Sequence, residues 1–187
     1  MPRIRAFIAL PTSSEVKQQI AAIQAKLIET QADVRWEGSE KFHITLKFLG
    51  DCEPEVLHSL LSDLQTSLRG TRSFELLYDA LGCFPNMTRP RVVWVGAQEN
   101  PQIATLQRLI EDACGKFGFA REERPFHAHI TLGRVKGNRP LDRLTETLKT
   151  VTFEPLQARC GEIHLMRSEL QPTGSVYSLL NSIPLLP

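Results

Sequence analysis

The sequence has few cysteines, no strong excess of charge of either sign and no long apolar run. Its four cysteines lie far apart and form no CxxC pair, which argues against both a zinc knuckle and a disulfide framework. They are expected to be reduced and structural. The formal net charge is +1, so the surface as a whole does not attract long nucleic acid, and any polyanion must be bound locally.

The longest apolar run near the start, AFIAL, is far shorter than a signal-peptide core or a membrane span. The sequence therefore predicts a cytoplasmic protein with no membrane partner. A chain of 187 residues can bury a sizeable core, and no Gly/Ser tract or charge run separates independent domains. We expect one domain over residues 1–187, made of two intertwined lobes and acting as a monomer.

Hydrophobic periodicity predicts four helices. In each of them apolar residues recur three or four positions apart, as on the buried face of an amphipathic helix. The first helix is expected to begin at a capping sequence, TSSE, at positions 12–15. The predicted helices run from this sequence to Leu27, from Val56 to Leu68, from Pro101 to Phe117 and from Leu141 to Leu148.

Segments with a period of two predict strands between these helices, and one tetrapeptide, HITL, occurs in two of them. Helices and strands interleave twice, with one HITL strand in each half. This order predicts an α+β fold with two lobes, in which the helices lie outside and the sheets meet at a central cleft. The strands are expected at 3–10, around Trp36, at 41–49, in a hairpin over 73–97, at the second HITL and in the last third.

The two HITL segments occupy positions 43–46 and 129–132. Side chains alternate faces along a strand, so His43 and Thr45 point one way while the isoleucine and leucine between and after them point to the core. The same parity holds for His129 and Thr131. Each half of the chain thus offers an imidazole that titrates near neutral pH beside a hydroxyl that can donate a hydrogen bond.

Two such units facing each other across a groove form an acid–base site. Cleavage of a phosphodiester needs a base for the attacking oxygen, an acid for the leaving oxygen and donors for the charged phosphate oxygens. Two histidines and two threonines supply all of these without a metal or another cofactor. One copy of HxT is a weak signal, whereas two copies at matching places are far more specific. If one histidine must be neutral and the other charged, the rate is expected to be bell-shaped between roughly pH 5 and 8.

The sequence also contains an HxH pair, His127 and His129, which is a less favoured start for a metal site. No carboxylate cluster or HExxH motif accompanies it, and metal sites need three or four converging ligands. A metal phosphohydrolase is therefore one alternative. A second is an RNA-end binding protein that keeps the cleft without the chemistry.

The chain resembles the RNA 2′,3′-cyclic phosphodiesterases, also called 2′-5′ RNA ligases, of the two-histidine (2H) phosphoesterase superfamily. The resemblance rests on segments in family order: RAFIALP, VRWEGSEKFHITLKFLGD, GCFPNMTRPRVVWVGA, ERPFHAHITLGR and SELQPTGSVYSLL. It implies a bilobal α+β fold with two pseudo-symmetric lobes, each with an antiparallel sheet and outer helices, whose sheets face a central cleft. It also implies that the protein binds RNA ends or nucleotides with a 2′,3′-cyclic phosphate and releases a 2′-phosphate.

Carried over by position, His43 and His129 match the family's catalytic histidines, and Thr45 and Thr131 match its phosphate-binding hydroxyls. By analogy His129 is the base that activates water and His43 the acid that protonates the departing 3′ oxygen. Because the lobes are pseudo-symmetric, the exchanged assignment stays open. The family usually has a proline before the second histidine, and Ala128 in its place is expected to loosen His129.

Arg134 matches an arginine that commonly follows the second motif, where a guanidinium would bind the phosphate. Strand parity puts it on the face opposite His129, so this role requires a bend, which we expect at Gly133. A solvated arginine at the strand end is the alternative.

Aromatic and basic residues near the first motif are candidates for RNA contacts. Phe48 and Trp36 could stack on a base, although the parity of Phe48 favours core packing. Lys47, Arg89 and Arg91 could contact the RNA backbone, or belong to a solvated face.

Overall fold

The computed structural model describes residues 2–137, 141–172 and 174–187, which form four α-helices, one short 3-10 helix and nine strands. The helices are α1 (Ser14–Ile28), α2 (Pro54–Ser67), α3 (Pro101–Gly115) and α4 (Asp142–Thr150), with the 3-10 helix η1 (Ser39–Lys41). The strands are β1 (Ile4–Pro11), β2 (Val34–Trp36), β3 (His43–Cys52), β4 (Phe74–Phe84), β5 (Val92–Ala97), β6 (His129–Val135), β7 (Leu156–Cys160), β8 (Glu162–Gln171) and β9 (Gly174–Pro184). All four predicted helices are confirmed.

The long helices begin where side chains satisfy free backbone amides. The hydroxyl of Ser13 accepts a hydrogen bond from the Val16 amide at the start of α1. At α3 the Asn100 side chain accepts from two amides, and Pro101 follows at a position whose N–H would have no partner in the helix. The N-cap of α1 is therefore Ser13, one residue later than the capping sequence suggests.

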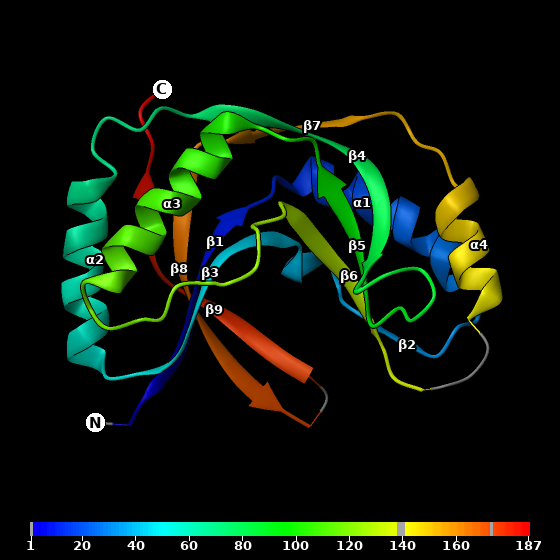
Figure 1. Cartoon of the computed structure of the whole chain (residues 1–187), viewed down its shortest axis with the longest axis horizontal. Coiled ribbons are helices and arrows are strands. Elements are labelled where there is room, and N and C mark those ends of the chain that lie inside the picture. Colours follow the sequence, from blue (N-terminus) through cyan, green and yellow to red (C-terminus); the bar gives the residue numbers. More distant parts are fainter. Residues whose placement is uncertain (1, 138–140, 173) are drawn as a thin grey trace.

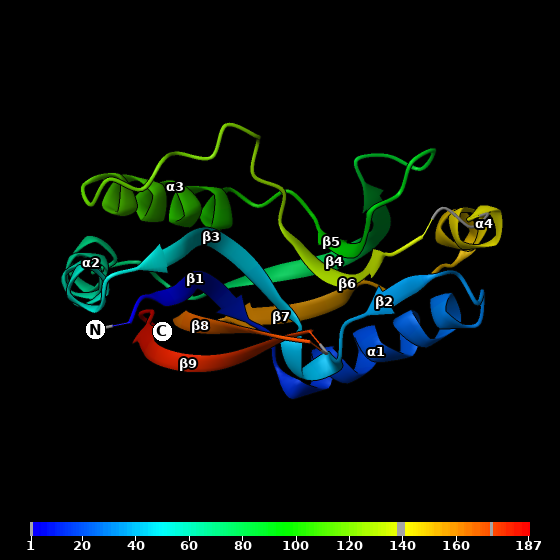
Figure 2. The same cartoon turned by 90° about the horizontal axis from the view of Figure 1, so that it is seen from below.

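The strands of the described residues form one antiparallel sheet in the order β7-β4-β5-β6-β3-β1-β8-β9, with β2 beside β6. Strands β3 and β6 are joined through the pair Ile44–Ile130, where the two halves meet. The sheet curls around this junction (Figure 2). The predicted α+β class and antiparallel lobes are confirmed, and the sheets of the two lobes are continuous with each other.

The helices cross between the two halves of the sheet. Helix α1 follows β1 along the chain, yet it packs against β7 and α4, and α4 packs against β4. Helix α3 follows β5 but packs against β3 and α2. Figure 1 shows the resulting two groups, with α2 and α3 on one side and α1 and α4 on the other. Each group of helices therefore contains one helix from each half of the sequence.

All four cysteines are free and buried, as expected for structural thiols. No helix among the residues that the structure describes is long and apolar enough to cross a bilayer.

Candidate active site

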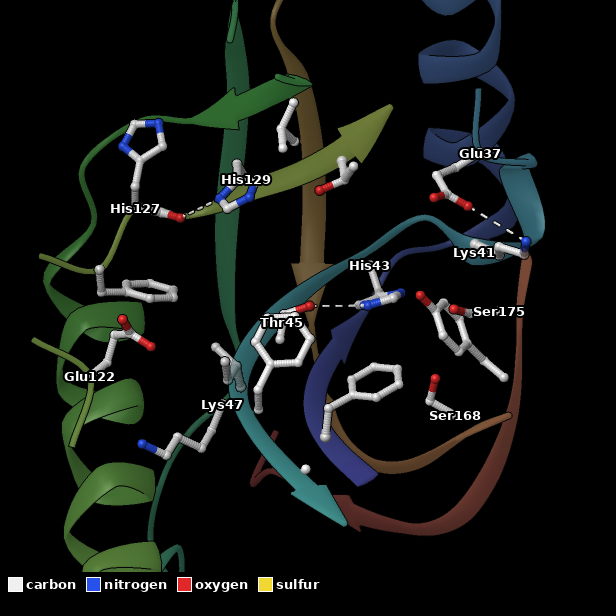
Figure 3. A pocket seen from close by; sticks show the side chains of 18 of the residues that line it. Glu37, Lys41, His43, Thr45, Lys47, Glu122, His127, His129, Ser168 and Ser175 are labelled. Carbon is white, nitrogen blue, oxygen red and sulfur yellow. Dashed lines mark hydrogen bonds and ion pairs between the residues drawn. The ribbon is translucent and has the colours of Figure 1, made fainter. Parts of the chain in front are cut away.

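A cleft of about 550 Å³ lies where the two halves of the sheet meet, and both HxT units line it. His43 and Thr45 project into it from β3, and His129 and Thr131 from β6. Figure 3 shows His43, Thr45 and His129 around this space. The isoleucine inside each motif is fully buried on the other face of the sheet. The structure thus brings the four predicted residues into one cleft.

The pairing of the two strands decides which groups of the motifs are neighbours. Ile44 lies opposite Ile130 in an antiparallel pair. In such a pair the residue before one partner faces the residue after the other, so His43 lies across from Thr131 and Thr45 across from His129. Each histidine therefore shares its side of the cleft with a hydroxyl from the other half of the chain.

The ring of His43 is held on several sides. Its Nε2 lies 3.2 Å from Oγ1 of Thr45. The ring stacks on Phe7 with centroids 5.0 Å apart, and the edge contact with Tyr177 has a centroid distance of 5.5 Å. These contacts fix the direction in which the ring faces the cleft.

Burial lowers the pKa of His43 to about 4. A hydrogen bond with the Lys41 backbone opposes this shift, while the positive charges of Lys17 and His129 add to it. A buried imidazole loses the hydration that stabilises its charged form, and cations nearby disfavour that form further. His43 is therefore neutral at pH 7 in the free protein.

His129 is oriented by its own chain, because its Nδ1 donates a 2.7 Å hydrogen bond to the backbone oxygen of His127. A carbonyl oxygen only accepts, so Nδ1 carries the proton and the neutral ring has a free lone pair on Nε2. The ring contacts Phe84 with a centroid distance of 5.0 Å. Burial lowers the pKa of His129, and the charges of His127 and Arg134 lower it further, against the raising effect of the backbone hydrogen bond.

The bend that Arg134 requires is present, one residue before the predicted position. Thr131 and Gly133 pair with successive residues of β5, so Leu132 is the extra residue of a β-bulge. The bulge restores the parity of Arg134, which lines the cleft with His129. At Gly133 a Cβ would lie 2.6 Å from Cγ1 of Val34, so the close approach of β2 requires glycine here.

The first motif has the same bulge, which makes the prediction of core packing for Phe48 wrong. Thr45 and Lys47 pair with successive residues of β1, so Leu46 is the extra residue. The side chain after it changes face, and Phe48 is 66% exposed in the wall of the cleft. Parity counted along an unbroken strand gave the opposite face.

The other candidates for RNA contacts differ in position. Lys47 lines the cleft, but its ammonium is buried in an ion pair with Glu111 at 2.8 Å and does not belong to a solvated face. Trp36 packs against the hydrophobic core, and Arg89 and Arg91 are exposed outside the cleft.

Sequence reasoning missed Arg35. It lies directly opposite Arg134 in the β2–β6 pair and also lines the cleft. Like charges placed opposite each other on neighbouring strands are destabilising, and an anion between them would relieve the repulsion. The signal is the pairing of β2 with β6, which joins segments about a hundred positions apart.

Within residues 2–137, 141–172 and 174–187 no three His, Cys, Asp or Glu side chains converge as metal ligands. His127 lines the cleft with its ring against Trp94, at a centroid distance of 4.8 Å. The HxH pair therefore has no third ligand in the described part of the chain, and the metal alternative gains no support from it.

A model of the 2′-5′ RNA ligase superfamily matches residues 12–172, and the chain belongs to this family. An RNA 2′,3′-cyclic phosphodiesterase from Methanothermobacter thermautotrophicus is 36% identical, over 94% of this chain and 96% of the relative. A protein of the same name from Thermotoga maritima is 30% identical, over 95% and 93%. The crystal structure of Escherichia coli LigT complexed with 3′-AMP superposes with a TM-score of 0.79 at 25% identity, covering 99% of both chains.

Proposed function

We propose that this chain is an RNA 2′,3′-cyclic phosphodiesterase that works by two-histidine acid–base catalysis. The observation that carries the proposal is that both HxT units line one cleft. Relatives with this name match nearly the whole chain and support the reaction class. The proposal takes the protein to act as a monomer in the cytoplasm, as the sequence predicts.

In the proposed reaction a water oxygen attacks the phosphorus of the cyclic phosphate. The bond from phosphorus to O3′ breaks, and the phosphate stays on O2′. His129 takes the proton of the attacking water at Nε2, and His43 gives a proton to the leaving O3′. One water is consumed, and the product has a 2′-phosphate and a 3′-hydroxyl. No step requires a metal.

The remaining groups of the cleft hold the charge of the phosphate. The hydroxyls of Thr45 and Thr131 donate to its non-bridging oxygens, and the guanidinium of Arg134 binds the same oxygens. Because each hydroxyl lies across from the histidine of the other strand, the phosphate is held between the two rings. This arrangement matches an in-line displacement, in which the attacking and leaving oxygens lie on opposite sides of the phosphorus.

Binding of the substrate favours the protonated histidine that the acid step requires. Burial lowers the pKa of both histidines, so both rings are mainly neutral in the free protein at neutral pH. A phosphate anion that enters the cleft favours an imidazolium beside it, which raises the pKa again. The acid therefore takes up its proton together with the substrate.

The same site would also join RNA ends. A 5′-hydroxyl in place of water would attack the cyclic phosphate and form a 2′-5′ phosphodiester with release of O3′. Water is present at far higher concentration, so hydrolysis is the expected main reaction.

An oligonucleotide that ends in a 2′,3′-cyclic phosphate, incubated with the protein in EDTA, tests this function. We expect complete conversion to a 2′-phosphate end. Tight binding without turnover would instead support the non-catalytic RNA-end binding protein. Activity lost in EDTA and restored by a divalent metal would contradict the metal-free reaction.

A further inference from the structure

We propose that Arg35 binds the phosphodiester that joins the last two nucleotides of an RNA end, while the cyclic phosphate of the last nucleotide lies at the two histidines. This inference rests on the proposed function and deepens it, because it assigns a second anion subsite in the cleft and a substrate class, oligonucleotides in preference to mononucleotides. Arg35 is then a specificity-determining residue that does not touch the reacting atoms.

Strand β2 presents one side chain to the cleft. It has three residues, and the two outer ones, Val34 and Trp36, pack against the hydrophobic core. Successive side chains of a strand point to opposite faces, so Arg35 points away from them. Within Val34–Trp36 it is the one residue that lines the cleft, and its side chain is exposed there.

Buried hydrogen bonds hold β2 against β6 and so fix the backbone that carries Arg35. The side-chain amide of Gln24, a buried residue of α1, donates to the backbone oxygens of Glu37 and Leu132, both at 2.8 Å. The backbone amide of Glu37 also donates to the Leu132 oxygen at 2.8 Å. A cation on a fixed strand loses little conformational freedom when an anion binds, so more of the interaction is retained as affinity.

Arg35 and Arg134 form a pair of like charges without an acidic partner. They lie directly opposite each other, and within residues 2–137, 141–172 and 174–187 neither guanidinium takes part in an ion pair. Glu37, which also lines the cleft, pairs instead with Lys41 at 3.5 Å (Figure 3). Like charges across a strand pair cost stability, so the cleft keeps two positive charges that bound anions would neutralise.

The pairing of the strands shows on which side of the reacting centre Arg35 lies. Strand β5 pairs with one edge of β6 along its length, so β3 and β2 both pair with the other edge, β3 at Ile130 and β2 from Gly133 onward. Arg35 therefore lies on the same side of β6 as His43, the proposed acid for the leaving O3′. That oxygen belongs to the ribose, so the sugar and its 5′ substituent lie on this side.

The two arginines suit two successive phosphates. Arg134 is on the strand of Thr131, and its charge lowers the pKa of His129, so it lies with the cyclic phosphate. The strand of Arg35 is about 4.8 Å further on, a distance of the same order as the step from one phosphate to the next in an RNA strand. The 5′ oxygen of the last ribose thus carries the next phosphate towards Arg35.

This chemistry predicts a preference for the ends of RNA chains without a preference for sequence. Every RNA chain has the phosphodiester that Arg35 would bind, and a phosphate contact does not read the base. A nucleoside 2′,3′-cyclic phosphate lacks this group, so it would leave the second subsite empty and would bind more weakly.

The test compares three substrates: adenosine 2′,3′-cyclic phosphate, an adenosine dinucleotide with the same cyclic end, and that dinucleotide with a neutral methylphosphonate linkage. We expect the wild-type KM to be about tenfold lower for the charged dinucleotide than for the neutral one, as for a hydrogen bond to a charged group. Arg35→Gln should remove this difference by raising the KM of the charged dinucleotide, with kcat little changed. The KM values of the other two substrates should not change.

Two further variants and a salt series separate anion binding from a structural role. Arg35→Lys keeps the charge and should restore most of the affinity for the charged dinucleotide. Arg143→Gln, which removes an exposed cation of α4 outside the cleft, is the matched control and should behave as wild type. In Arg35→Gln the slope of log KM against log salt for the charged dinucleotide should be smaller by about 0.7, because one contact to a single-strand phosphate is lost.

An unchanged KM for the charged dinucleotide in Arg35→Gln would overturn the inference. Equal losses on the mononucleotide and the dinucleotide would also overturn it, since Arg35 would then bind the cyclic phosphate together with Arg134. If the wild-type protein turned over none of the three substrates, the proposed function would fail. Calorimetric titration with the two dinucleotides would then still decide the role of Arg35, because Arg35→Gln should weaken binding of the charged one alone.

Discussion

His43 and His129 occupy corresponding positions in the two halves of the sheet, but their surroundings differ. His43 contacts the rings of Phe7 and Tyr177 and the hydroxyl of Thr45, and its pKa is lowered to about 4. His129 donates to the chain just before it, and its pKa is also lowered.

The comparison shows that the repeated motif fixes where the rings lie, while the neighbouring strands set how readily each ring takes up a proton. Burial is the main cause at both sites, and the cations around each ring act in the same direction. The two halves also differ three residues after each threonine, where the equivalent positions of β3 and β6 carry Phe48 and Arg134.

Removing either ring should have the largest effect on activity. His43→Ala and His129→Ala are each expected to lower kcat about a thousandfold, since a positioned acid or base contributes this order of rate enhancement. His58→Ala, on the exposed face of α2, should leave kcat unchanged. Full activity in either cleft variant would show that the two halves do not both take part.

Acid should destabilise the fold through these rings. The unfolded His43 takes up a proton near pH 6.5, whereas the folded one does so only near pH 4. The unfolded state therefore binds more protons in this range, and the free energy of unfolding falls by about 3 kcal/mol as the pH drops from 6.5 to 4.

Denaturant unfolding of the wild type and of His43→Gln at a series of pH values measures this term. We expect the free energy of unfolding to fall less steeply with decreasing pH in His43→Gln than in the wild type. His129→Gln should reduce the steepness in the same direction, but by less. Identical pH dependence in wild type and His43→Gln would mean that this ring is not desolvated in the folded state.

Removing one threonine hydroxyl at a time should distinguish the roles of the two halves of the cleft. Thr45→Val and Thr131→Val keep the shape of the side chain and remove a donor to a charged phosphate, so each should lower kcat/KM about tenfold or more. Because Thr45 also contacts Nε2 of His43, only Thr45→Val should shift the pH profile. A comparison of the two profiles checks this, and equal shifts would remove the distinction between the hydroxyls.

The pH optimum of the reaction should reflect the lowered pKa values of the two buried histidines, and this is the smallest of the expected effects. Both pKa values are lowered, so a bell in kcat/KM, which reports the free enzyme, is expected to have its maximum below pH 6.5. This is lower than the range expected for unperturbed histidines. The kcat profile should lie at higher pH, because bound phosphate raises the pKa values. Profiles of kcat and kcat/KM that coincide would contradict this.

Much of this arrangement could be predicted from local sequence. The apolar stripe of α3, which includes Ile103, Leu106 and Ile110, is buried as its spacing indicates. The two HxT units could be assigned to one face of each strand because alternation is a local property. The prediction failed for Phe48, since the bulge at Leu46 depends on how β1 pairs with β3.

Arg35 was missed for a related reason. Its place beside Arg134 depends on the pairing of β2 with β6, which no local pattern encodes. The pairing of strands that are distant in sequence thus explains why Phe48 was placed on the wrong face and why Arg35 was overlooked.

The central claim is that the two HxT units form one anion site. Titration with inorganic phosphate, followed by the ring resonances of His43, His129 and His58 in NMR spectra, tests it most directly. We expect the pKa values of His43 and His129 to rise as phosphate binds, with one common dissociation constant for phosphate, while the ring resonances of His58 do not move. A response from only one of the two cleft histidines, or saturation at two different phosphate concentrations, would contradict a shared site.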